Sequence, residues 1–378
     1  MASSESNKKS NVLESNQDLI SSLPTDLIDE ILKRLPVSMV AKTSALSRKW
    51  RRNWLSLKYF VFDKSFWEEH KSNTNFDWKR INEIIGSILL YHNDPVHEFY
   101  LHVPNDLDHE FYLNISQWLS FLSRAAIKKI SLVNLAKADS LPVMPSHIFA
   151  CNELVHLKIV NYALNLNAPS DCIGFAYLRN LELLSVEFKH DVFRSLITSC
   201  PRLTHLRLKD CIGITNLVFD HVPILKILSI QGSFASLAFR NTFHLKRISL
   251  SLSPMENTTY LETVSAILAL ALPPVELQFL RFDGLLCKVT PSKNVLQHKF
   301  DYNNNFKLRH LLKAKITGIT GSSLELKLVE YIAGISVKLK KFMFKCAKLD
   351  PSSELKVLRE LLQLPRASKR AKLVCLAQ

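Results

Sequence analysis

The sequence predicts an α/β chain in which a short three-helix segment precedes an irregular solenoid with a curved parallel sheet, followed by an α+β cap at the C-terminus. Three observations support this fold class. Apolar residues at helical spacing occur in residues 16–60, a six-residue pattern L-x-x-L-x-L recurs from residue 96, and helix-like and strand-like stretches alternate after residue 318.

The composition is that of a globular protein with a basic surface. Hydrophobic residues make up 47% of the 378 residues and charged residues 22%, which excludes disorder over the whole length. Lysine and arginine number 49 against 34 acidic residues, so the net charge is +15. A positive charge of this size could serve to bind nucleic acid, an anionic surface or an acidic protein, and the net charge alone does not distinguish these partners.

Targeting and redox signals are sparse. Residues 1–15 are polar and are predicted to be a disordered tail without an apolar secretion signal. The most apolar stretch, residues 266–272, ends at two prolines and is too short to span a membrane. The 7 cysteines are dispersed and form no C-x-x-C pair, which predicts free thiols in a reducing compartment, the nucleus or the cytoplasm, and no metal site.

Residues 16–60 predict three short helices. Thr25 is expected to cap the first helix, and Pro36 cannot continue it. The second helix is expected to begin near Ser38, and the third to carry Trp50. Helices this short bury too little surface to be stable alone, so their apolar side chains need a neighbour in the chain or in another protein.

The same segment carries a spaced motif: Leu23-Pro24, then Ile31-Leu32-x-x-Leu35-Pro36, then Thr43-Ser44-x-Leu46-Ser47-Arg48-x-Trp50-Arg51. This motif resembles the F-box of plant F-box proteins, a family in which it binds a Skp-type adaptor of a cullin–RING ubiquitin ligase. A helical hairpin with a basic tip is the alternative interpretation. The resemblance implies an apolar adaptor-binding set: Leu23, Pro24, Ile28, Ile31, Leu32, Leu35, Pro36, Val40, Leu46 and Trp50.

Residues 61–95 form a predicted linker with one helix. Ile81, Ile85 and Leu89 fall on one side of that helix. A solenoid exposes apolar side chains at its ends, so we interpret this helix as a cap on the N-terminal end.

Residues 96–317 are predicted to be a leucine-rich-repeat solenoid, because the pattern recurs at intervals of 20–32 residues between Ile127 and Leu277. The first positions of its copies are Val96, Ile127, Leu154, Leu181, Leu203, Leu225, Leu245, Leu277 and a degenerate Leu311. Each copy predicts a short strand with apolar positions in the core and the intervening side chains on the concave face. Asn134, Asn161 and Asp210 follow their strands, where they could bond the turn backbone.

Two stretches resemble repeat units of plant F-box repeat proteins: Phe149-x-Cys151-x-x-Leu154-x-x-Leu157 and Leu196-Ile197-x-Ser199-Cys200-Pro201-x-Leu203-x-x-Leu206-x-Leu208-x-x-Cys211. The resemblance implies that these three cysteines are small buried core residues.

Residues 318–378 predict a helix, a strand, an amphipathic helix over residues 354–364 and a final strand. The stretch Leu361-Leu362-x-x-Pro365-Arg366-Ala367-Ser368-x-x-Ala371-x-Leu373 resembles the FBD module of plant F-box/FBD/leucine-rich-repeat proteins. We interpret this FBD-like module as a C-terminal cap. It is basic, but Phe342 and Phe344 have strand-core spacing, which disfavours stacking on nucleic-acid bases.

No catalytic motif, cofactor-binding loop or metal-ligand pattern is present in the sequence. The resemblance implies a non-catalytic substrate-recognition subunit of an SCF-type cullin–RING E3 ubiquitin ligase, without a cofactor. The alternative is a leucine-rich-repeat scaffold that does not deliver ubiquitin and that could associate with nucleic acid.

The predicted substrate-facing side chains are basic. They occupy the third, fifth and seventh positions of the central copies: His156, Lys158, His205, Arg207, Lys209 and Arg247. One interpretation is a solvated face, and the other is a site for an acidic or phosphorylated protein segment. In the second case the two histidines would tighten binding as the pH falls toward about 6.

Overall fold

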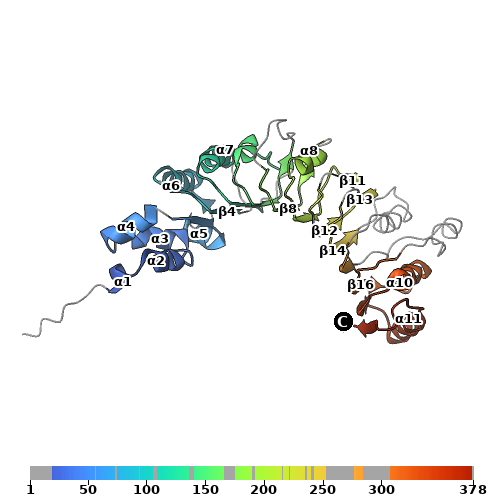
Figure 1. Cartoon of the computed structure of the whole chain (residues 1–378). Helices are drawn as coiled ribbons and strands as arrows, with labels where there is room; N and C mark the ends of the chain where they lie inside the picture. Colours follow the sequence, from blue (N-terminus) through green and yellow to red (C-terminus); the bar gives the residue numbers. More distant parts are fainter. Residues whose placement is uncertain are drawn as a thin grey trace, which may run out of the picture.

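The structure is a computed structural model that describes residues 19–55, 57–72, 75–92, 94–104, 109–135, 140–165, 175–189, 192–214, 216–220, 222–234, 236–239, 242–252, 276–283 and 307–376. The tail before residue 16 and the apolar stretch at 266–272 lie outside these ranges. Figure 1 shows an arch with the main sheet along its inner, concave side and the helices that follow the N-terminal segment along its outer side. This arrangement confirms the predicted α/β solenoid.

One sheet runs the length of the arch, with 12 strands in the order β1-β4-β5-β6-β8-β10-β12-β14-β15-β16-β17-β18. Every neighbouring pair in it is parallel. Its strands are β1 Tyr59–Phe62, β4 Glu98–Val103, β5 Lys129–Asn134, β6 His156–Val160, β8 Asn180–Leu184, β10 His205–Lys209, β12 Ile227–Gly232, β14 Arg247–Leu252, β15 Phe279–Asp283, β16 Lys313–Ile319, β17 Lys341–Cys346 and β18 Lys372–Cys375.

The remaining elements are short strand pairs and helices. The strand pairs are β2 Lys71–Ser72 with β3 Asn75–Phe76, β7 Ala163–Leu164 with β9 Glu187–Phe188, and β11 Asn216–Phe219 with β13 Ser236–Phe239. The helices are α1 Leu19–Ser22, α2 Thr25–Leu32, α3 Val37–Thr43, α4 Arg48–Leu55, α5 Lys64–Glu69, α6 Trp78–Leu90, α7 His109–Arg124, α8 Val192–Thr198, α10 Ser323–Ile335 and α11 Pro351–Gln363, with a 3₁₀ turn at Ser146–Ala150.

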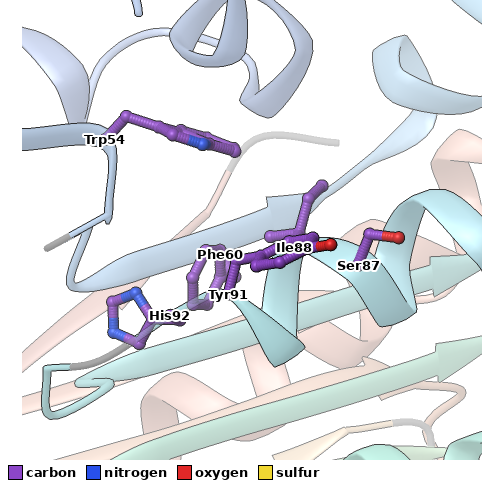
Figure 2. A pocket seen from close by; sticks show the side chains of 6 residues that line it. All are labelled: Trp54, Phe60, Ser87, Ile88, Tyr91 and His92. Atoms are coloured by element: carbon purple, nitrogen blue, oxygen red, sulfur yellow. The ribbon is translucent and has the colours of Figure 1, made fainter. Parts of the chain in front are cut away.

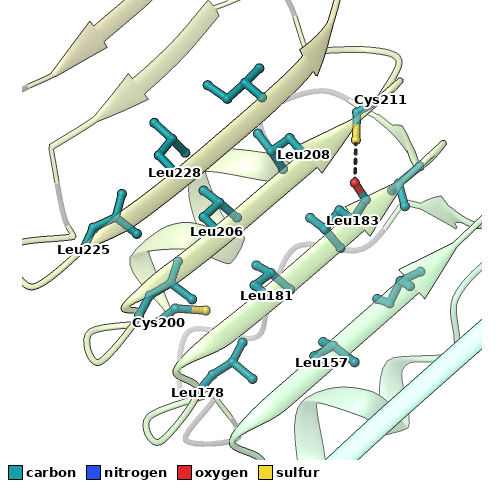
Figure 3. Packing of buried hydrophobic residues seen from close by; sticks show 14 of the residues in the cluster. Leu157, Leu178, Leu181, Leu183, Cys200, Leu206, Leu208, Cys211, Leu225 and Leu228 are labelled. Carbon is teal, nitrogen blue, oxygen red and sulfur yellow. Dashed lines mark hydrogen bonds between the residues drawn. The ribbon is translucent and has the colours of Figure 1, made fainter. Parts of the chain in front are cut away.

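Leucine ladders hold the coils together, because alternate strand residues point to opposite faces. Leu157, Leu181, Leu206 and Leu228 are in register on four successive strands and are all buried (Figure 3). No coil can cover these side chains alone, so each is stabilised by its neighbours.

The predicted core cysteines are buried. Cys211 donates its S–H to the Leu183 carbonyl oxygen over 3.4 Å (Figure 3). Burial raises the pKa of Cys211 to about 11 and that of Cys151 to about 12. Both thiols therefore stay protonated at neutral pH, and all three buried cysteines pack as small apolar groups.

Strand ends turn through left-handed backbone. Asn161, Ser185 and Asp210 have φ of 58°, 51° and 51° directly after their strands. Asn161 and Asn134 also exchange side-chain to carbonyl hydrogen bonds, which confirms the expectation that these two amides bond the turn backbone. Asparagine suits such positions because its short side chain bonds locally.

One repeat was placed in the wrong register by the sequence pattern. The expected copy Leu181/Leu184/Val186 is in fact Leu178/Leu181/Leu183, since Leu181 pairs with Leu157 and Leu206. The leucine-rich run 178–184 fits the template in two registers three residues apart. The correct register places Asn180 and Glu182 on the concave face.

A repeat at the N-terminal end was missed. Leu57, Phe60 and Phe62 are buried and form the first copy, and their strand β1 pairs with β4. This copy was not detected because phenylalanine occupies two of its three apolar positions, where the L-x-x-L-x-L pattern has leucine. Helix α6 consequently lies on the outer side, between β1 and β4 in sequence, and does not cap the array end. Instead, helices α3 and α5 contact β1.

The helical boundaries also differ slightly from expectation. Thr25 is the first residue of α2 and makes no capping hydrogen bond, because Pro24 holds the cap position. On α11, Val357 and Leu361 are buried whereas Leu355 and Leu362 are exposed, so the buried face is narrower than the leucine stripe suggested.

The sheet continues without interruption through β16, β17 and β18, across the predicted boundary at residue 318. Helix α10 begins with a capping box in which Glu325, 1% exposed, accepts hydrogen bonds from the backbone amides of Thr320, Gly321 and Ser322. The sequence boundaries proposed for the separate segments stay predictions.

Candidate functional site

The N-terminal helices present an apolar surface at one end of the arch. Among the ten predicted adaptor-binding residues, Pro24, Ile31, Pro36 and Leu46 are exposed, and Leu23 and Leu35 are half-buried. An exposed apolar group on so small a helical unit is available to a partner.

The other four members of the predicted set face the interior: Ile28, Leu32, Val40 and Trp50. Helices α2 and α3 both contact α4, and these side chains belong to the core that joins them. Any role of these four in adaptor binding would be to hold the exposed residues in place.

Further exposed apolar residues of these helices were not in the predicted set, among them Leu19 and Ile20 on α1. Leu27 is 52% exposed and Met39 is 46% exposed. Leu27 lies four residues before Ile31 in α2, so the two share one helix face. The i, i+4 spacing was the sequence signal for Leu27.

Polar contacts fix this helical end to the array. Lys58 bonds Asp29 over 2.9 Å, which joins α2 to the start of β1, and hydrogen bonding to this carboxylate raises the pKa of Lys58. Lys42 bonds Glu69 over 3.0 Å and joins α3 to α5. Exposed pairs of this kind contribute little energy.

A hollow of about 200 Å³ lies at the same junction, lined by Trp54, Phe60, Ser87, Ile88, Tyr91 and His92. Figure 2 shows Trp54 facing the α6 side chains across this space. The His92 ring packs edge-on against Phe60 with centroids 5.1 Å apart. The lining of the hollow is mostly apolar.

The structure places all six predicted substrate-facing residues on the concave face. In the first outward row, His156, Asn180, His205, Ile227 and Arg247 are in register on successive strands. In the second row, the order is Lys158, Glu182, Arg207, Ser229 and Ser249, and Lys209 lies in a third row. The six residues therefore share one face, but uncharged and acidic residues separate them.

Part of the positive charge here is neutralised within the chain. Lys129 pairs with Glu98 over 2.7 Å, and Arg207 lies 3.7 Å from Glu182. Glu182 on β8 thus lies between Arg207 on β10 and Lys158 on β6, which is in register with it. The resulting surface alternates in charge, and a hollow of about 250 Å³ lies over Tyr100, Lys129, His156, Lys158 and Glu182, among others.

The two histidines are tuned against protonation. Burial, followed by the charge of Lys129, lowers the pKa of His156 below 6.5. Burial, followed by Lys226 and Arg247, lowers the pKa of His205. Both rings therefore gain their charge at a lower pH than a free histidine side chain, and the expectation that they strengthen anion binding as the pH falls stays a prediction.

The same rows continue onto the last strands, where the first outward position is Lys313, Lys341 and Lys372 in register. Lys341 and Lys372 were absent from the predicted site because β17 and β18 were interpreted as a cap, and Lys313 was absent because only the central copies were used. The third position of Leu311-x-x-Ala314-x-Ile316 and of Leu339-x-x-Phe342-x-Phe344 was the available signal.

The described ranges contain no group of three or more histidine, cysteine or acidic residues that could hold a metal ion. Within the same ranges, no helix combines the length and apolar character needed to cross a membrane.

Comparison with known proteins agrees with the two-part architecture. Residues 20–62 match the F-box domain family, and residues 115–274 match the family described as FBD-associated F-box protein At5g56370, LRR repeats. The first match covers α1 to β1, and the second covers the middle of the arch.

Similar proteins from Arabidopsis thaliana share this layout. F-box/FBD/LRR-repeat protein At1g13570 is 28% identical over 95% of this chain and 98% of its own length. F-box/LRR-repeat protein At3g26922 is 26% identical over 70% of this chain and 93% of its own length. F-box/FBD/LRR-repeat protein At2g04230 is 30% identical over 50% of this chain and 42% of its own length. The chain therefore carries an F-box domain match on its N-terminal helices and an LRR match on its twelve-stranded parallel array, and it is similar over most of its length to an F-box/FBD/LRR-repeat protein of Arabidopsis thaliana.

Proposed function

We propose that this protein is the substrate-recognition subunit of an SCF-type cullin–RING E3 ubiquitin ligase. The observation that carries the proposal is the F-box match over residues 20–62, on helices that expose apolar side chains and are joined directly to an open parallel array. One end of the arch then binds a Skp-type adaptor, and the concave face binds the target protein.

In this proposal the adaptor contacts Ile31 and Leu46, together with Leu27 and the prolines at the helix starts. Each is exposed in the free chain and would be covered on binding. Burial of such side chains is favourable by about 25 cal/mol per Å² of apolar surface removed from water. The buried residues Ile28, Leu32, Val40 and Trp50 contribute by keeping the helices rigid.

The contribution of the array is proximity. A protein target held on the concave face is kept near the ubiquitin donor of the complex, which raises its effective concentration. The covalent chemistry would take place on other subunits, so the proposed role requires neither a catalytic residue nor a cofactor in this chain. The proposal places the protein in the nucleus or the cytoplasm, where such ligases work.

The test is co-purification of the full chain with a Skp-type adaptor and a cullin. The Ile31→Asp variant should lose the adaptor, because it buries a charge in an apolar contact. Leu362→Asp is the matched control, since Leu362 is an exposed leucine on α11 at the other end of the arch. Recovery of the adaptor with Ile31→Asp, or no recovery with the unmodified chain, would contradict the proposal. Recovery of the adaptor without a cullin would favour the alternative function, a leucine-rich-repeat scaffold that does not deliver ubiquitin.

A further inference from the structure

The concave face is unevenly charged along the arch. On β4 to β10, lysine and arginine side chains alternate with glutamates, as in Lys129–Glu98 and Arg207–Glu182. On β16 to β18 the described outward positions hold no acidic residue at all. They are Lys313, Lys315 and Thr317 on β16, Lys341, Met343 and Lys345 on β17, and Lys372 and Val374 on β18.

Five lysines therefore form a lysine ladder at the C-terminal end: Lys313, Lys315, Lys341, Lys345 and Lys372. Adjacent strands are about 4.8 Å apart, so the first row extends over about 10 Å. Lys315 lies about 7 Å further along its strand. Lys313, Lys341 and Lys372 are exposed, and none of the five forms an ion pair with any other described residue.

The nearest acidic residue on this face is already engaged. Asp283 on β15 pairs with Arg281 over 2.6 Å and accepts a hydrogen bond from the Thr317 hydroxyl over 2.6 Å. It does not neutralise the ladder. Like charges directly opposite one another on paired strands destabilise a sheet, so the ladder lowers the stability of the unliganded protein.

No carboxylate of the described residues forms an ion pair with the ladder. Its charge is therefore available to another molecule.

We infer that the lysine ladder binds an acidic segment of the target protein, with carboxylates or phosphates at alternate positions of an extended chain. This inference rests on the proposed function, since it names the class of substrate. An extended segment repeats its side chains on one side every ~7 Å, the same interval that separates Lys313 from Lys315. The outward positions of these strands carry no aromatic side chain for base stacking, which favours a polypeptide over single-stranded nucleic acid.

The site is distinct from the adaptor surface. The F-box helices and β16 to β18 lie at opposite ends of the arch (Figure 1). The ladder is also distinct from the six residues expected from the sequence, which lie on β6, β10 and β14.

The test measures binding of labelled peptides of about 12 residues to the full chain by fluorescence anisotropy, with a length chosen to cross the ladder. The probes are a peptide with alternating glutamates, its phosphoserine counterpart, an uncharged glutamine counterpart and an oligothymidine strand. The ladder variant is Lys313→Gln/Lys341→Gln/Lys372→Gln. The matched control is Lys327→Gln/Lys356→Gln/Arg359→Gln, which removes the same charge from exposed positions on α10 and α11.

We expect the ladder variant to bind the acidic peptides about tenfold more weakly and the control to change by less than about twofold. The ratio of the affinities for the glutamate and phosphoserine peptides shows whether the ladder binds carboxylates or phosphates more tightly. Equal weakening by both variants, or equal binding of the glutamine peptide, would overturn the inference. Tighter, ladder-dependent binding of oligothymidine would overturn it in favour of nucleic acid.

Adaptor capture by the same variants separates the two proposals. If the ladder variant retains the adaptor but loses the peptide, both proposals stand. If the unmodified chain binds the acidic peptide but captures no adaptor, the proposed function fails while the acidic-ligand site remains. If it captures the adaptor but binds no acidic peptide, the ladder inference alone fails.

Discussion

Asn134 and Asn161 bond to each other's backbone at the ends of β5 and β6. The Asn134 amide donates to the Asn161 carbonyl oxygen over 3.2 Å, and the Asn161 amide donates to the Asn134 carbonyl oxygen over 2.6 Å. Asn134 is fully buried, so its polar atoms depend on partners in the chain. This pair ties two coils together where each strand turns outward.

Replacement of Asn134 by alanine should lower the free energy of unfolding by about 1 kcal/mol, because it removes the hydrogen bond to the half-buried Asn161 carbonyl. Urea denaturation followed by circular dichroism measures the change. Asn152→Ala, at an exposed position in the same region, should have little effect. Equal effects of the two variants would show that the pair does not stabilise the coils.

Gly321 should not tolerate a side chain. Its φ of 87° is strained for other residues, and a Cβ would lie 2.4 Å from Cγ2 of Val357 on α11. Gly321→Ala should destabilise the protein by at least about 1 kcal/mol. Val357→Ala alone creates a cavity and should also destabilise the protein. The double variant should lose less stability than the sum of the two single variants, because the smaller side chain removes the clash. Strictly additive melting shifts for the two changes would contradict this geometry.

A chain that ends between Gly318 and Gly321 should aggregate. It would remove β17, which covers one edge of β16, and would expose the core residues Ile316 and Ile319. Solenoid coils depend on contacts with their neighbours. Size-exclusion chromatography and thermal melting are the measurements. A soluble, cooperatively melting fragment would instead indicate that the FBD-like module is an independent domain.

Lowering the pH should reduce the folding stability of the protein through two histidines on the concave face. His156 and His205 have pKa values below 6.5 in the folded state, so the unfolded chain binds more protons as the pH falls through 6.5. Stability contributed by the two neutral rings is therefore present above pH ~6.5 and decreases below it. The double variant His156→Gln/His205→Gln should have a flatter melting profile between pH ~7 and ~5. Steeper destabilisation in that variant would exclude this origin.

The repeat array was predictable because each strand buries every second residue, which leaves a strong leucine pattern. The register failed only where leucines are dense, at residues 178–184, and the first copy was hidden by Phe60 and Phe62. Which F-box residues are exposed could not be predicted, since Leu27, Ile28, Ile31 and Leu32 form one apolar stripe in the sequence. Only packing against α4 separates buried Ile28 from exposed Leu27.

The sequence indicated the lysine ladder only in part, through the third positions of two repeat copies, Lys313 and Lys341. Each lysine is ordinary in a basic segment, and their alignment depends on the register of β16, β17 and β18. The absence of neighbouring carboxylates on that face likewise follows from the pairing of strands far apart in the chain.

The most direct test of the central claim is the dissociation constant of the full chain for a Skp-type adaptor, measured by calorimetry at about 0.1 M and about 0.5 M salt. An apolar contact predicts little change with salt and a loss of about 2 kcal/mol, roughly thirtyfold in affinity, for Ile31→Ala. Binding that falls steeply with salt yet tolerates alanine at Ile31 and Leu35 would contradict the account.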